Sequence, residues 1–109
     1  MNTIEMIDKE LLTLAAKAAG IEGVWDNESK CFVPADGPIV WEPLSHDGAA
    51  LRLAVKLGFS IKHYYYEGDY FIKVPVNDVA MTEPLATDTY AATRRAIVRA
   101  AAAIGEQMK

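Results

Sequence analysis

The chain has little of what disulfide, metal and membrane chemistry require. Cys31 is the only cysteine, so no disulfide can form within the chain and no cysteine pair can bind zinc. No run approaches the roughly 20 apolar residues that span a bilayer, and the N-terminus lacks the basic and apolar segments of a signal peptide. These absences predict a cytoplasmic protein with no membrane segment, no metal and no cofactor.

Positive charge is also in short supply. The chain has 15 acidic and 11 basic residues, so no strong field should draw nucleic acid or anionic lipid to the whole molecule. Its 109 residues, 51% of them hydrophobic, are typical of one globular domain, which we expect to span residues 1–109.

Three segments have the apolar spacing of amphipathic helices. The first is predicted over residues 4–19 and is closed by Gly20. The second is predicted to begin at Asp47 as its N-cap, and the third at Thr87 or Asp88. The inward-facing residues are predicted to be Ile4, Ile7, Leu11, Leu14 and Ala18 in the first helix, Leu51, Ala54 and Val55 in the second, and Tyr90, Ile97, Val98, Ala101, Ile104 and Met108 in the third.

Short β-prone segments lie between these helices. A first hairpin is predicted to join Val24–Trp25 to Cys31–Val33, and Ile39–Trp41 to form a further edge strand. Residues 77–86 contain a proline and little periodicity, and they are predicted to be a loop.

A second hairpin is predicted from Phe59 to Val76, with a two-residue turn at Gly68–Asp69. This register puts Tyr65 opposite Ile72, His63 opposite Val74 and Ile61 opposite Val76 on one mostly apolar face. The other face, called here the aromatic face, carries Lys62, Tyr64, Tyr66, Phe71 and Lys73. We expect a helix or a second subunit to cover it, because large exposed apolar patches are rare on monomers.

The element pattern predicts an α+β fold, a small α/β sandwich. Three helices should pack on a mainly antiparallel sheet of three to five strands, built around the Ile61–Val76 hairpin.

Two stretches resemble a known family. Residues 41–58, WEPLSHDGAALRLAVKLG, resemble the block W-x-P-L-x-x-D-G-x-A-L-R-L-A-V-x-L of small tailed-phage and prophage proteins, the phage alpha-beta-alpha sandwich domain. Residues 92–101, ATRRAIVRAA, resemble the last helix of that family. The chain departs from the family pattern at His46 and Ala49, where acidic residues are expected. The resemblance implies a fold and a phage or prophage origin but no reaction, because the family has no assigned activity.

The residue types that carry chemistry form no convincing site. Ser45, His46 and Asp47 are the types of a hydrolase triad, but triad members reach one another from separate segments, and consecutive residues cannot easily do so. His63 is expected to be partly buried on the apolar hairpin face, and Cys31 to be a half-buried strand residue without reactivity. We therefore predict no catalytic, metal or cofactor residues.

Other conspicuous side chains have structural interpretations. Trp25 and Trp41 are expected in the core, and Arg94, Arg95 and Arg99 on a solvated face of the last helix.

The function predicted is that of a non-enzymatic accessory protein of phage or prophage origin, which binds an unidentified host or phage macromolecule or a further copy of itself. The alternative is a single-stranded nucleic-acid binder in which the aromatic face stacks bases while its lysines and the helix arginines meet phosphates. The acidic balance of the chain disfavours nucleic acid. An enzyme whose site forms between subunits is a third interpretation.

Overall fold

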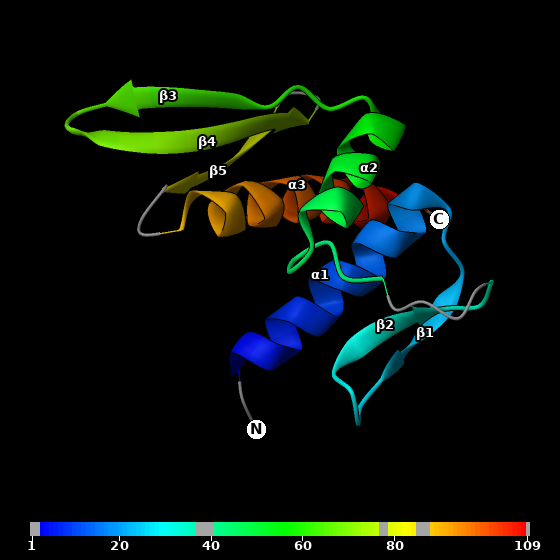
Figure 1. Cartoon of the computed structure of the whole chain (residues 1–109). Helices are drawn as coiled ribbons and strands as arrows, with labels where there is room; N and C mark the ends of the chain where they lie inside the picture. Colours follow the sequence, from blue (N-terminus) through cyan, green and yellow to red (C-terminus); the bar gives the residue numbers. More distant parts are fainter. Residues whose placement is uncertain (1–2, 37–40, 77–78, 85–87, 109) are drawn as a thin grey trace.

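A computed structural model of the chain describes residues 3–36, 41–76, 79–84 and 88–108. Within these ranges it contains three helices and five strands (Figure 1): α1 (Thr3–Ala19), β1 (Gly23–Asp26), β2 (Cys31–Pro34), α2 (Asp47–Leu57), β3 (Lys62–Tyr66), β4 (Asp69–Val76), β5 (Val79–Pro84) and α3 (Thr89–Gln107). The α+β prediction with three helices is confirmed. The strands are divided between two antiparallel sheets, β1-β2 and β3-β4-β5, rather than joined in one. No helix in the described part of the chain is long and apolar enough to cross a membrane.

Helix α3 is the centre of the molecule. Both α1 and α2 pack against it, and its N-terminal part supports β4 and β5 (Figure 1). The buried residues Ile97 and Val98 of α3 share one core with Ile72 and Val74 of β4, all of them at most 2% exposed. The inner stripe predicted for α3 is thus confirmed for Ile97, Val98 and Ala101, in the middle of the helix. Its ends differ, because Tyr90 is 70% exposed and Met108 42% exposed.

The inward faces predicted for α1 and α2 are wrong in part. In α1 the residues that lie fully inside are Leu12, Ala15, Ala16 and Ala19, whereas Ile7 is exposed and Leu11 and Leu14 are half-buried. In α2 they are Ala49, Ala50, Leu53 and Ala54, whereas Leu51 and Val55 are exposed. Each helix thus presents mainly alanine to the core. Small side chains allow the helix axes to approach more closely than leucine and isoleucine would.

The first hairpin is confirmed. Strands β1 and β2 pair from Gly23 with Pro34 to Asp26 with Cys31. Trp41 forms an isolated bridge to Phe32, and their rings meet edge to face with centroids 5.8 Å apart. Ile39 and Val40, predicted to continue that strand, lie outside the described residues.

The second hairpin has the predicted faces but a different register. Lys62 pairs with Lys73, Tyr64 with Phe71, and Tyr66 with Asp69. The turn residues are Glu67 and Gly68, with φ of 48° and 87°, and two consecutive positive values are typical of a type I′ hairpin turn. The predicted turn at Gly68–Asp69 is therefore one residue too late, and the predicted pairs are displaced by two. A displacement of two keeps every side chain on its face, because side chains alternate with period two.

Strand β5 was not predicted. It pairs along β4 from Val79 with Val76 to Pro84 with Phe71, in the segment that the sequence predicted to be a loop. Its proline is compatible with this place, because proline is confined to edge strands and strand ends.

Candidate interaction surface

No described helix lies over the aromatic face. Helix α3 packs on the opposite face of β4 and β5, where Ile72, Val74 and Val76 are buried. On that same opposite face its Thr93 reaches His63 of β3. The expectation that a helix covers the aromatic face is therefore wrong for the described part of the chain. The physical reason is that the apolar side of α3 is already used on the opposite face of the sheet. Covering by a second subunit stays a prediction.

Two aromatic rings lie at the centre of this face. Tyr64 and Phe71 are directly opposite each other, and their rings stack with centroids 5.5 Å apart and planes 23° from parallel. Both side chains are half-buried by this contact, while Tyr66 beside them is 60% exposed. The result is a preformed aromatic pair that is partly accessible to solvent, with an exposed tyrosine beside it.

Two lysines lie beside the rings, on the side away from the hairpin turn. Lys62 and Lys73 are also directly opposite each other and exposed, and within the described residues neither side chain makes a hydrogen bond or an ion pair. Like charges at directly opposite positions of a sheet repel. The aromatic face therefore carries local positive charge that no described acidic group neutralises, in a chain of net charge −4.

The hairpin projects beyond the first turn of α3 (Figure 1), and its tip, residues 65–70, is rich in tyrosine. The rings of Tyr65 and Tyr70 are 5.0 Å apart, and each residue is 62% exposed although both lie on the face that α3 covers farther along. Glu67 and Asp69 lie at the turn and make no ion pair with any described residue. The tip is thus aromatic with an acidic edge.

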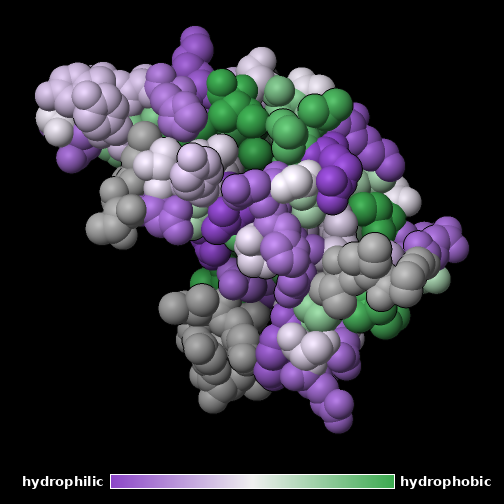
Figure 2. Space-filling view, in the orientation of Figure 1, coloured by the Kyte–Doolittle hydropathy of each residue, from purple (hydrophilic) through white to green (hydrophobic). Residues whose placement is uncertain are grey.

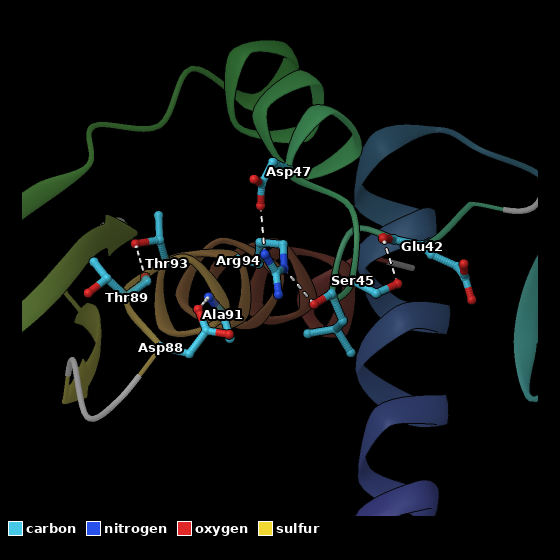
Figure 3. A network of polar contacts seen from close by, with 9 residues as sticks. Glu42, Ser45, Asp47, Asp88, Thr89, Ala91, Thr93 and Arg94 are labelled. Atoms are coloured by element: carbon cyan, nitrogen blue, oxygen red, sulfur yellow. Dashed lines mark hydrogen bonds and ion pairs between the residues drawn. The ribbon is translucent and has the colours of Figure 1, made fainter.

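The arginines of α3 are not free for a ligand, which corrects the prediction of a solvated face. Arg94 Nη1 lies 2.6 Å from Asp47 Oδ1, and Arg94 Nε donates to the Leu44 carbonyl at 2.8 Å (Figure 3). Arg95 lies 3.2 Å from the Asp8 carboxylate, and Arg99 pairs with Glu83. All three are on the side of the sheet away from the aromatic face.

Asp47 has a different role from the one predicted. The N-cap of α2 is His46, with no side-chain cap bond, and Asp47 is the first helical residue. Its carboxylate turns to Arg94 instead (Figure 3), so it joins α2 to α3 across the two segments that carry the family resemblance. In α3 the cap is as predicted, since Asp88 Oδ1 accepts the Ala91 amide at 3.0 Å. Thr87, the other predicted cap, lies outside the described residues.

The neighbouring residues of the triad-like segment both contact Glu42 rather than each other. Ser45 Oγ donates to the Glu42 carbonyl at 3.5 Å, and His46 Nδ1 lies 3.8 Å from Glu42 Oε2. His63 is on the predicted face but is exposed, and its Nε2 lies 3.5 Å from Thr93 Oγ1 of α3. Within the described residues no group of three or more His, Cys, Asp or Glu could hold a metal ion.

The buried cysteine and the tryptophans are mainly structural. Cys31 is 2% exposed in β2 and so is more buried than expected, whereas Trp25 and Trp41, expected in the core, are half-buried against it. Next to Cys31, the side-chain hydroxyl of Ser29 and then its backbone N–H donate to the Asp26 carboxylate and lower the pKa of that group.

A groove of about 290 Å³ lies between α2, β3 and α3. Its apolar lining includes Leu51, Ile61, Tyr90 and Ile97, and Figure 2 shows hydrophobic residues gathered over α2 and the adjoining part of the hairpin. This groove was not predicted from the sequence, because Leu51 and Tyr90 were expected to face the core. Apolar periodicity alone does not show which helix face is covered.

The chain matches no family model, no curated protein and no solved structure. The resemblance to the phage sandwich domain therefore stays a prediction based on two sequence segments.

Proposed function

We propose that this protein is a non-catalytic binding protein, an accessory protein of phage or prophage origin acting in the cytoplasm, that engages a macromolecule through its aromatic face. The observation that carries the proposal is the stacked pair Tyr64 and Phe71, which is half-buried but lies under no described helix and has the exposed Tyr66 beside it. Exposed aromatic clusters are typical of interaction sites, because they offer large contact area and lose little conformational entropy on binding.

The surroundings support a binding role. The aromatic pair needs no rearrangement to receive a partner, since its rings already stack in the free chain. The lysine pair beside the rings adds directional contacts at one edge of the patch. The side chains of residues 45–47, which have catalytic residue types, face other groups of the protein.

A photo-crosslinking residue in place of Tyr66 tests this proposal in the native host cell. Tyr90 is the matched control position, since it is a tyrosine of similar exposure, 70%, that lies on α3. We expect position 66 to give a specific adduct with a different macromolecule, apart from any adduct with a second copy of the chain, and position 90 to give no foreign adduct. Equal labelling from both positions, or no foreign adduct from position 66, would contradict the proposal.

Single-stranded nucleic acid is a second candidate partner, favoured by one specific observation. The Lys62–Lys73 pair lies two residues along the strands from the Tyr64–Phe71 stack. A basic pair beside stacking rings is the arrangement that single-strand binders use. The net charge of −4 and the pairing of the α3 arginines with acids weigh against it.

Titration with a single-stranded oligonucleotide separates the two candidates. A nucleic-acid platform should lose about 1–3 kcal/mol of binding free energy on Phe71→Ala and weaken as salt is added. Lys73→Gln should weaken binding and Lys9→Gln, on α1, should not. Absence of binding at low salt would remove this candidate and leave a protein partner.

A further inference from the structure

The free edge of β3 is less protected than the other edge of its sheet. β3 is an outer strand whose one described neighbour is β4, and its register is unbroken by a bulge. It has no proline, and the described contact of α3 with it, from Thr93 to His63, is a side-chain contact on one face of the strand. At the opposite edge, β5 contains Pro84 and packs against α3. Natural sheets protect exposed edges with proline, bulges or covering helices, so the contrast marks the β3 edge as a place where another strand can pair.

We infer that this edge binds a second copy of the chain, with the two β3 strands antiparallel about a twofold axis at Tyr64. The axis must lie level with one residue, so that this residue is opposite its own copy. An axis level with the midpoint between two residues would set side chains of opposite faces against each other, whereas residues opposite one another in a sheet point to the same side. This register places Tyr66 opposite the partner's Lys62, and His63 opposite the partner's Tyr65. By symmetry each pair occurs twice. Both Lys62–Tyr66 pairs bring an ammonium group against an aromatic ring. Across the dimer interface no lysine lies opposite a lysine.

Charge complementarity supports the same arrangement. Centring the pair on Tyr64 brings the hairpin turn of one copy, with Glu67 and Asp69, alongside the partner's segment between α2 and β3. That segment is flanked by Lys56 and Lys62, both exposed. Among the described residues none of these four groups makes an ion pair within its own chain. Glu67, Asp69, Lys56 and Lys62 thus make no ion pair with the described residues of their own copy. In the dimer the acidic groups of each copy would lie near the lysines of the other.

The exposed apolar area is appropriate for such a contact. Tyr65, Tyr66 and Tyr70 are each 60% or more exposed, and a tyrosine exposed to that extent presents about 100–150 Å². The three together present roughly 300–450 Å², about half of the ~800 Å² per partner in a standard interface. The remainder would come from the strand backbone and from Val55, which is 71% exposed near the end of α2.

The dimer would join two three-stranded sheets into one and make the two aromatic faces continuous. It stands on the strand edge, the tip charges and the exposed tyrosines, and it does not depend on the proposed function.

Sedimentation equilibrium over a wide concentration range tests this inference through a charge swap. The wild-type chain should be a dimer. Tyr66→Lys should weaken dimerisation at least tenfold, because it sets two lysines opposite each other at two symmetric places. Adding Lys62→Glu to Tyr66→Lys should restore the dimer, because a lysine then faces a glutamate. Tyr90→Lys, the same change at an exposed tyrosine on α3, should leave the dimer intact.

Circular dichroism of each variant keeps the result interpretable, since Tyr66 is exposed and its replacement should leave the hairpin folded. A wild-type chain that is monomeric at all concentrations overturns the inference. So does a Tyr66→Lys variant that dimerises like wild type, or a folded double variant that stays monomeric.

Discussion

Replacing Gly105 with alanine should destabilise the protein, although alanine is the better helix former. Gly105 is buried in α3 where α1 crosses it, and a Cβ built there would lie 2.0 Å from the carbonyl oxygen of Leu14 and 2.8 Å from its carbonyl carbon. Both atoms belong to the backbone of α1, so no side-chain rotation can relieve the overlap. The helices must move apart, which loosens the alanine contacts between them.

The expected size follows from two opposing effects. Inserting a methyl group into a well-packed core costs about 1–3 kcal/mol, and an overlap with backbone calls for the upper part of that range. The gain in helix propensity from glycine to alanine is about 1 kcal/mol. Gly105→Ala should therefore lower the free energy of unfolding by about 2 kcal/mol in urea denaturation.

Gly48 provides a matched control in α2. It is exposed, and a Cβ there would meet the end of the flexible Arg52 side chain at 3.2 Å. Gly48→Ala should thus raise stability by about 0.5–1 kcal/mol. Leu14→Ala should not rescue Gly105→Ala, because the obstacle is a backbone oxygen. A Gly105→Ala variant as stable as wild type would refute the close crossing of α1 and α3.

Three further predictions concern polar contacts. Asp88→Ala should cost about 1 kcal/mol of unfolding free energy, because this carboxylate caps α3. Asp47→Ala should cost less in the same assay, below about 1 kcal/mol, since its ion pair with Arg94 is mostly solvent-exposed on the aspartate side; a loss larger than that of Asp88→Ala would contradict this order. In an NMR titration the pKa of Asp26 should lie below 3.8, and Ser29→Ala should raise it. Because the folded-state pKa is lowered, the stabilisation by this carboxylate is present above the unfolded-state pKa and is lost as pH falls through the folded-state value.

Much of the local structure followed from the sequence because local rules are sufficient for it. The cap at Asp88 and the left-handed Gly20 depend on a few neighbouring backbone groups, and both are as predicted. The two faces of the second hairpin were also right, since alternation along a strand decides them. The turn was misplaced by one residue because Glu67 adopts the positive φ that was expected of glycine or aspartate.

The candidate surface could be predicted only as a set of residues. Alternation placed Tyr64, Tyr66 and Phe71 together, but whether anything covers them depends on where α3 packs. The apolar groove beside α2 was missed for the same reason, because periodicity marks an apolar stripe without naming its partner. The role of Asp47 was likewise decided by Arg94, 47 residues away in the chain.

The sequence by itself determined the element types, the faces of the hairpin and the α+β class, because these depend on spacing and on neighbouring backbone groups. Only the tertiary structure decided which side of α1 and of α2 is buried. Both helices bury mainly alanine rather than leucine and isoleucine, and in α1 the reason is that α3 approaches it so closely at Gly105 that small side chains fit best between the two helices. The tertiary structure also assigned β5 to the sheet and left the aromatic face open, because the one apolar side of α3 can cover only one face of the sheet.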